Sequence, residues 1–337
     1  MLTLFSLPKP FRGHIDVIQR NALRSWTLLD PRPEVILFGD DYGTSEVARD
    51  FSFLHVPAIA RNAHGTPLIG DMFAQAQRMA THDVLCYVNA DILLMSDFTP
   101  AIRRLAGSRL SFLMVGQRWD MDVTEPLTLD ATWEDRLRAD ISRRGVLHAV
   151  TGIDYFAFQR GMWGEIPPFA IGRSIWDEWL LFRARRRGAV IVDATEVVTA
   201  VHQNHDYRHI STAGTWDSML NSQEALVNQK LGGGPDRQFT LYDANLLLTP
   251  KGLVPATRPE HVRRAKETRL ILFSPWLHDT WKRLNTEWGS VRRSRSRLPE
   301  RHELTALALR IRYFSVRYAV RRLLSRPSGV DGGEDGR

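Results

Sequence analysis

The sequence has little that could stabilise it covalently or anchor it in a membrane. It contains one cysteine among 337 residues, so disulfide bonds within the chain are excluded. That residue, Cys86, lies inside an apolar run, where a buried structural thiol is a better interpretation than a nucleophile. No stretch reaches the roughly 18 consecutive apolar residues of a transmembrane helix, and residues 1–10 lack the basic segment of a signal peptide. We therefore expect a cytoplasmic protein, either free or peripheral at the inner face of the membrane.

Sequence motifs of several enzyme classes are also absent. The chain has no G-x-x-x-x-G-K-[ST] and no G-x-G-x-x-G at a strand–helix junction, which argues against P-loop and dinucleotide-binding proteins. It has no G-x-S-x-G elbow of an α/β-hydrolase. Pro8-Lys9-Pro10 follows the first expected strand, where a sugar-nucleotide pyrophosphorylase would have a glycine-rich basic loop.

Positive charge is concentrated at the C-terminal end. Residues 256–337 hold 19 of the 45 Lys and Arg but only 9 of the 38 Asp and Glu. The rest of the chain has 26 basic and 29 acidic residues, a nearly neutral balance. This division argues against a nucleic-acid-binding body and indicates a basic appendage on a near-neutral domain.

Apolar runs typical of buried strands alternate with segments of helical periodicity, which predicts an α/β fold with a doubly wound, mostly parallel sheet flanked by helices. The expected strands are 2–7, 35–38, 53–56, 84–88, 110–115, 155–158, 190–192 and 197–201, and the expected helices are 15–29, 45–49, 67–80, 133–144 and 176–186, with Thr66 as the N-cap of the third helix. We expect three parts: a domain over 1–250, a basic helical extension over 251–326 and a disordered tail over 327–337.

The extension contains a strongly helical segment over 302–325 with two apolar seams and arginines between them. Such a helix can pack on its own protein, join an oligomer or lie on an anionic membrane surface. The sequence leaves these alternatives open.

Polar clusters follow several of the expected strands. Asn89-Ala90-Asp91 interrupts an apolar run, Asp40 and Asp41 follow another, and Asp120 follows a third. Ligands bind at the carboxyl ends of strands in open α/β sheets, so these clusters should share one rim. An aspartate there can take a hard divalent cation that bridges a nucleotide diphosphate.

The chain resembles the nucleotide-sugar-dependent glycosyltransferases of the GT-A fold (family 2-like) over roughly residues 1–250. The resemblance lies in Asn89-Ala90-Asp91 in the place of the family's Asp-x-Asp, Arg61-Asn62-x-x-Gly65, Gly152-Ile153-Asp154-Tyr155-Phe156, Trp176-Asp177-Glu178-Trp179 and the late His202. It implies a GT-A-type sheet that binds a nucleotide-diphosphate sugar together with Mn²⁺ or Mg²⁺.

In such enzymes the aspartates of the Asp-x-Asp motif hold the cation against the donor diphosphate. The resemblance therefore makes Asp91 a metal ligand, with His202, or else His205, supplying a further one. Asn89 departs from the motif: it is neutral and a weaker ligand, although it can hydrogen-bond ribose hydroxyls. The donor-binding residues that the resemblance implies are Ser6, Pro8, Asp40, Asp41, Arg61, Asn62, Asn89 and Asp154.

Asp177 is the expected general base, because sugar transfer with inversion needs a carboxylate to take the proton of the acceptor hydroxyl. Glu178 should point about 100° away on the helix, so only one of the two should face the acceptor. Arg173 is expected to hold a phosphate or to orient Asp177. The residues expected at the acceptor are Trp119, Asp120, Trp176 and Trp179.

The sequence therefore predicts a metal-assisted, inverting glycosyltransferase that acts on a glycan or lipid-linked hydroxyl acceptor and has no nucleic-acid partner. The alternative is a non-catalytic module that keeps the fold and binds a nucleotide or glycan, a possibility that Asn89 raises.

Overall fold

The computed structural model describes residues 2–205 and 222–294. The chain divides into two compact units, Met1–Pro275 and Trp276–Arg337. The expected helix over 302–325 and the expected tail over 327–337 lie outside the described residues.

The first unit is built on a nine-stranded sheet in the order β13-β12-β10-β6-β9-β4-β1-β2-β3. Seven strands run parallel to one another, and β9 and β13 run antiparallel to their neighbours. The strands are β1 (Leu2–Ser6), β2 (Glu34–Phe38), β3 (Leu54–Val56), β4 (Val84–Val88), β6 (Phe112–Val115), β9 (Tyr155–Gln159), β10 (Val190–Asp193), β12 (Leu246–Thr249) and β13 (Gly252–Pro255).

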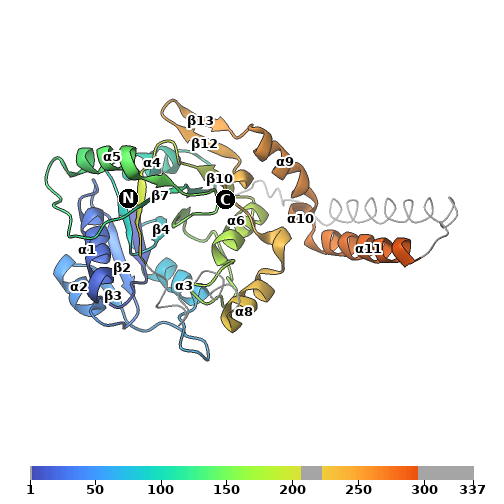
Figure 1. The fold of residues 1–337 in the computed structure, drawn as a ribbon, viewed down its shortest axis with the longest axis horizontal. Coiled ribbons are helices and arrows are strands. Elements are labelled where there is room, and N and C mark those ends of the chain that lie inside the picture. Colours follow the sequence, from blue (N-terminus) through green and yellow to red (C-terminus); the bar gives the residue numbers. More distant parts are fainter. Residues whose placement is uncertain (1, 206–221, 295–337) are drawn as a thin grey trace, which may run out of the picture. The chain divides into compact units, whose positions relative to one another are not determined.

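Helices cover both faces of this sheet (Figure 1). Alternate residues of one strand enter two different cores: Cys86 of β4 packs with α1, α2 and α4, and Leu85 packs with α3 and α6. The helices of the first unit are α1 (Gly13–Thr27), α2 (Thr44–Phe51), α3 (Ile69–Met79), α4 (Phe98–Ala106), α5 (Trp133–Arg144), α6 (Trp176–Arg186), α8 (Gln223–Gly232), α9 (Pro259–Glu267) and α10 (Arg269–Phe273).

The reversed direction of β9 matters for the rim of the sheet. Val88 of β4 pairs with Tyr155 of β9, so the amino end of β9 lies beside the carboxyl end of β4. Asp154 directly precedes β9 and therefore reaches the same edge as Asn89, whose backbone N–H donates to the Asp154 carbonyl at 3.0 Å.

A second, four-stranded sheet has the order β5-β11-β7-β8. Its strands are β5 (Ile92–Leu94), β11 (Ala200–Gln203), β7 (Arg118–Met121) and β8 (Val146–Leu147). In its register His202 of β11 lies opposite Ile92 on one side and Asp120 on the other. This sheet therefore brings residues from three distant parts of the chain next to Asp91.

The predicted mostly parallel α/β sheet with flanking helices and C-terminal helices is confirmed, with two local corrections. Thr66 is not the N-cap of α3, because Pro67 forms a bridge with Arg61 and the helix begins at Ile69. The strand expected over 197–201 is β11 over Ala200–Gln203, so His202 lies within the strand rather than after it.

The main sheet includes β12 and β13, α9 contacts residues Leu241–Asp243 and α10 contacts α6, so the compact unit runs to Pro275. The described part of the second unit is most of α11 (Pro275–Ser294). None of the described helices combines the length and apolar character needed to cross a membrane.

Candidate active site

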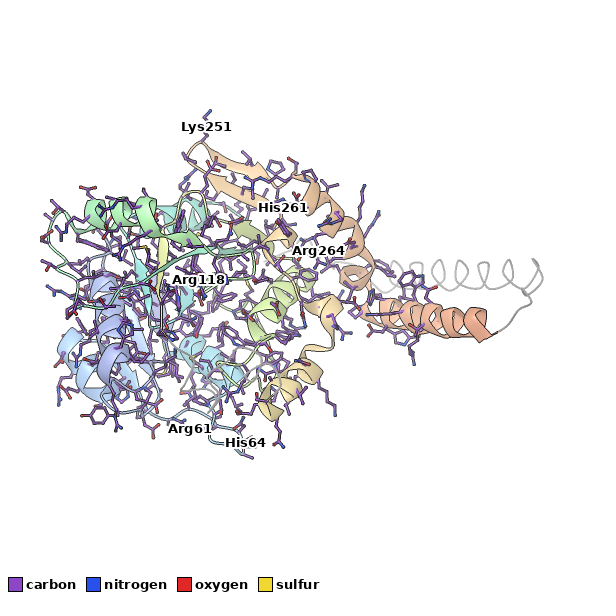
Figure 2. All side chains as sticks on the ribbon, in the orientation of Figure 1. Arg61, His64, Arg118, Lys251, His261 and Arg264 are labelled. Atoms are coloured by element: carbon purple, nitrogen blue, oxygen red, sulfur yellow. The ribbon has the colours of Figure 1, made fainter. Side chains whose placement is uncertain are left out.

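A pocket of about 790 Å³ opens at the rim where the strands β1 and β4 end. Its walls come from the segments after β1, β3 and β4, from the loop before β9, from residues 171–178 and from the end of β11. Arg118, Arg61 and His64 all line this pocket. In Figure 2 Arg118 lies near the centre of the fold, whereas Arg61 and His64 lie on the loop after β3. The volume is in the range of small-molecule binding sites.

Three side chains in the pocket are arranged as a cation site. Asp91, His202 and His205 each offer one ligand atom, and these atoms lie within 4.8 Å of one another. Asp91 and His202 are each only 6% exposed. The Oδ1 of Asp91 is buried and has no hydrogen-bond partner among the described residues. A buried, unpartnered carboxylate oxygen beside two imidazoles fits a divalent cation.

Positive groups surround Asp91. Its Oδ2 lies 3.1 Å from His205 Nε2 and 3.6 Å from Lys9 Nζ, and Lys9 Nζ is 3.0 Å from the same histidine nitrogen. Burial alone would raise the pKa of Asp91, but the hydrogen bond with His205 and the charges of Lys9 and His202 hold that pKa well below its usual range. Asp91 is therefore an anion at any physiological pH.

Asp120 contacts Arg118 and two histidines, His148 and His202, all of which line the pocket. It accepts hydrogen bonds from Arg118 Nε at 2.9 Å, and its Oδ2 lies 2.6 Å from His148 Nδ1. His202 Nδ1 is 3.4 Å from Asp120 Oδ1. Burial opposes ionisation, yet contacts with His202, His148 and Arg118 lower the pKa of Asp120. The sequence placed Asp120 at the acceptor, whereas it lies beside His202 and is not among the residues that line the pocket.

Asn89 lines the pocket, but both ends of its amide have partners. Its Oδ1 accepts from Tyr87 Oη at 2.6 Å, and its Nδ2 donates to Asp154 Oδ1 at 2.5 Å. The other oxygen of Asp154 accepts from Arg118 Nη1 at 2.7 Å. Asn89 is thus a link between Tyr87 and Asp154, and within the described residues the candidate cation site has one carboxylate and two imidazoles.

At the other end of the pocket, Asp177 and Glu178 occupy the first turn of α6, and both line the cavity. Neither has an ion pair within residues 2–205 and 222–294. Burial raises the pKa of Asp177 to about 6, although backbone N–H groups of its own helix stabilise the charged form. Burial and the charge of Asp177 raise the pKa of Glu178 to about 7. Both residues therefore line the cavity, and which of them faces an acceptor stays a prediction.

The aspartates after β2 divide between two environments. Asp40 is mostly exposed and accepts from Arg61 at 2.6 Å, and it does not line the pocket. Asp41 does line it, and burial raises its pKa despite the nearby Arg61. Of the two candidates for a nucleobase, Asp41 is the one that the pocket exposes to a ligand.

Glu224 of α8 binds two residues that the sequence assigned to the donor or to catalysis. Asn62 donates to Glu224 Oε1 at 2.7 Å, and Arg173 donates to Glu224 Oε2 through Nε at 3.1 Å and through a second nitrogen. Arg173 still lines the pocket, but its guanidinium is held by Glu224 rather than by Asp177. Asn62 does not line the pocket in the described structure.

Of the three tryptophans expected at the acceptor, only Trp176 lines the pocket in the described structure. Trp179 packs against Phe169 in the core, and Trp119 packs in the small core beside α5, so neither lines the pocket. Trp176 does line it but is 7% exposed, with its ring edge-to-face against Tyr87. These rings are apolar enough, and close enough to the sheet, to be taken into the core. Pro8 lines the pocket, whereas Ser6 is fully buried beneath it.

Several pocket residues were missed by the sequence reasoning. Arg118 could have been found, because period 2 in a strand places Arg118 and Asp120 on one face and Trp119 on the other. Glu224 gave no comparable signal, since its contacts depend on how α8 packs. The lining residues without a predicted role include Tyr87, Arg118, His148, Gln229 and Gln238.

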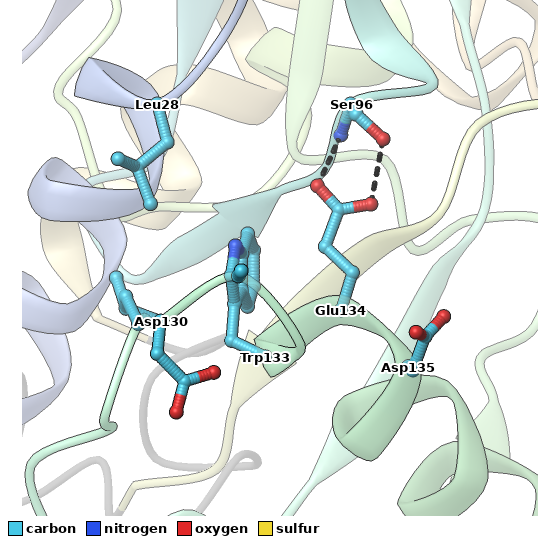
Figure 3. A pocket seen from close by; sticks show the side chains of 8 residues that line it. Leu28, Ser96, Asp130, Trp133, Glu134 and Asp135 are labelled. Atoms are coloured by element: carbon cyan, nitrogen blue, oxygen red, sulfur yellow. Dashed lines mark hydrogen bonds between the residues drawn. The ribbon is translucent and has the colours of Figure 1, made fainter.

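A second pocket of about 480 Å³ lies at the amino end of α5 (Figure 3). Glu134 there uses both carboxylate oxygens to accept from the backbone N–H and the hydroxyl of Ser96, at 2.8 and 2.6 Å. Its acidic side chain therefore anchors α5, and we assign no ligand to this pocket.

No protein-family model and no curated protein sequence matches the chain significantly. Among solved structures, a glucosyl-3-phosphoglycerate synthase from Mycobacterium tuberculosis, solved with Mn²⁺, UDP and phosphoglyceric acid, is 16% identical with a TM-score of 0.42, over 70% of this chain and 79% of that one. GalNAc-T7, solved with UDP, GalNAc and Mn²⁺, is 16% identical with a TM-score of 0.45, over 69% of this chain and 48% of that one. Likeness at this level leaves the substrates and reaction of this chain to be inferred from its own residues.

Proposed function

We propose that this protein is a GT-A-type glycosyltransferase, which moves a sugar from a nucleotide-diphosphate sugar to a hydroxyl of a glycan or lipid-linked acceptor. The observation that carries the proposal is the shared pocket: the candidate cation site of Asp91, His202 and His205 lines the same cavity as the carboxylates of Asp177 and Glu178. This arrangement suits a reaction that releases a diphosphate at one end and removes a proton at the other.

Mn²⁺ or Mg²⁺ bound by Asp91 and the two histidines would offset the charge of the departing diphosphate. Lys9 lies beside the same carboxylate and would add a second positive charge there. Arg118 donates hydrogen bonds to both Asp120 and Asp154, so it would hold this part of the pocket wall in a fixed position beside the donor. Asp41 would accept an N–H of the nucleobase, and Arg61 would lie near it.

Asp177 would act as the base and take the proton of the acceptor hydroxyl, which makes inversion the favoured outcome. A pKa of about 6 is closer to neutrality than that of an ordinary aspartate, so the group is mostly ionised at pH 7 and yet a better base. Glu178, with a pKa of about 7, would hydrogen-bond another hydroxyl of the acceptor.

The test is donor cleavage by the full chain. We would screen nucleotide diphosphates and their sugars by thermal shift with and without Mn²⁺, because a ligand that binds only the folded state raises its melting temperature. The best donor would then be assayed for release of the nucleotide diphosphate. Mn²⁺-dependent release by the native protein and none by Asp91→Ala is the expected result.

A non-catalytic nucleotide-binding module is the second candidate, and the specific observation that favours it is Asn89 with its amide fully engaged. Thermal shifts with donors but no cleavage, with or without candidate acceptors, would select this alternative. A place at an anionic membrane surface, suggested by the basic residues 256–337, is a separate part of the proposal that co-sedimentation with phosphatidylglycerol vesicles would test.

A further inference from the structure

One stripe of α8 faces the loop that leads into α6. Glu224, Asn228 and Gly232 are four residues apart along α8, so they lie on a single face of the helix. Each contacts a residue of the segment 170–175, which ends where the first turn of α6 begins. Asp177 stands in that first turn.

Asn228 binds both ends of this segment. It is fully buried, its Oδ1 accepts from the Ala170 backbone N–H at 2.9 Å, and its Nδ2 donates to the carbonyls of Ala170 at 3.0 Å and Ser174 at 3.2 Å. One side chain therefore satisfies three backbone groups of the loop. Its removal would leave those groups without a protein partner in a buried place.

Ile175 connects the loop to α6 in an unfavourable backbone conformation. Its φ is +91°, a strained conformation that a β-branched residue rarely adopts. Ile175 is 7% exposed, and a Cβ on Gly232 would lie 2.5 Å from its Cγ2. The close approach of α8 through this glycine thus confines Ile175 from one side.

Glu224 extends the contact to the donor side of the pocket. It binds Arg173 of the same segment and also Asn62, which belongs to the loop after β3. That loop contributes Arg61 and His64 to the pocket wall. One helix thus connects the wall on the expected donor side to the segment that carries the expected base.

We propose that α8 positions Asp177 for proton removal and that Asn228 is the principal positioning residue, acting through the segment 170–175 and Ile175. This inference deepens the proposed function and rests on it. The charged or titratable groups that act on Asp177 are Glu178 on its own helix, Asp154, Arg118 and Tyr87, and none of them belongs to α8. A change at Asn228 therefore alters the position of the base without removing a charge beside it.

The experiment compares Asn228→Ala with Gln223→Ala in the full chain. Gln223 is an exposed amide on the same helix, so it is a matched control for the loss of an amide. The first readout is the pKa of Asp177, measured by carboxyl ¹³C NMR without substrates and assigned with Asp177→Asn. In Asn228→Ala we expect this pKa to move from about 6 toward 3.8, the ordinary value, as the turn becomes exposed to water.

The second readout is kinetic. Misplacement of a reacting group by about 1 Å can cost on the order of 100-fold in rate, so we expect kcat to fall at least about tenfold while the donor KM stays within about twofold. The acid limb of the pH profile should shift with the NMR pKa. Gln223→Ala should match the native protein in every measurement.

Glu224→Gln is the second variant, because it keeps Asn228 and should fold even if Asn228→Ala does not. It should shift both readouts in the same direction by a smaller amount. An unchanged pKa and kcat in a folded Asn228→Ala, or in Glu224→Gln if only that variant folds, would overturn the inference, and so would equal effects from Gln223→Ala. The NMR titration needs no donor or acceptor, so it decides the positioning role even if no sugar transfer is found.

Discussion

The two ends of the pocket place the same kind of side chain in opposite surroundings. Asp91 is enclosed by Lys9 and two histidines, which hold its pKa well below the usual range. Asp177 is half-buried and has no ion pair within the part of the chain that the structure describes, and its pKa is raised to about 6. Two carboxylates whose environments push their pKa values apart are suited to different tasks, the first to holding a positive charge and the second to exchanging a proton.

The largest effect should come from the end rich in positive charge. Asp91→Ala removes the carboxylate of the described cation cluster, so we expect Mn²⁺ binding to be lost and sugar transfer to fall about 10⁴-fold, equivalent to several kcal/mol of transition-state stabilisation. Isothermal titration with Mn²⁺ and a transfer assay would measure both. Asp83→Ala, at a side chain that is 97% exposed, is the control, and undiminished Mn²⁺ binding in Asp91→Ala would contradict the comparison.

Asp177→Asn should impair proton removal at one end of the pocket and leave the cation site at the other end unaffected. Loss of the base should lower transfer about 10³-fold while Mn²⁺ binding stays intact. The pKa of Asp177 is higher in the folded state than in the unfolded state, so ionisation of this group destabilises the fold. The destabilisation is absent below about pH 4 and complete above about pH 6. The variant should therefore be more stable than the native protein at pH 8, by on the order of 2 kcal/mol, with the difference vanishing toward pH 4. Urea unfolding at the two pH values would test this, and a variant less stable at pH 8 would refute it.

The pH dependence of sugar transfer by the native protein would test whether Asp177 acts as the base. Since the base must be ionised, and since kcat/KM follows ionisation of the free enzyme, kcat/KM should rise about tenfold per pH unit below pH 6 and level off above it. The groups that act on Asp177 are Glu178, Asp154, Arg118 and Tyr87, and Glu178→Gln should leave an acid limb in place. A limb that disappears in Glu178→Gln would transfer the role of base to that residue.

The smallest expected effect concerns the residue between the two ends. Asn89→Asp would place a second carboxylate 2.5 Å from an oxygen of Asp154, which we expect to cost roughly 1–3 kcal/mol of unfolding free energy. The double variant Asn89→Asp/Asp154→Asn restores one donor opposite one acceptor and should recover part of the loss. Equal instability of the single and double variants would show that the pairing does not matter.

The parts of the fold that the sequence predicted are those with a strong local period. Residues 133–144 and 176–186 are helices with the expected bounds, because their apolar residues recur every three or four positions. The start of α3 was predicted wrongly, because Pro67 forms an antiparallel β-bridge with Arg61 instead of beginning the helix. The strand β8 and the helix α8 were not foreseen, since their stability comes from packing partners far away in the chain.

The same distinction holds for the site. Asp91 and Asp177 were predictable because each follows or begins a strongly patterned element, and both line the pocket. The tryptophans were misassigned, because sequence cannot tell a ring that covers a cavity from one that fills the core. The linkage of Arg173 to Glu224 spans 51 residues and depends on the packing of α8, which leaves no trace in local periodicity.

The reversed strand β9 determines how the rim is aligned. Phe156 and Phe158 enter one core while Tyr155 and Ala157 enter the other, so a slip of one residue against β4 would exchange all four side chains between the two faces. The packing of aromatic rings in the core therefore fixes the register of β9 and, with it, the position of Asp154. Because the core sets this register, we expect substitutions at the rim to change the chemistry of the pocket while β9 keeps its place beside β4.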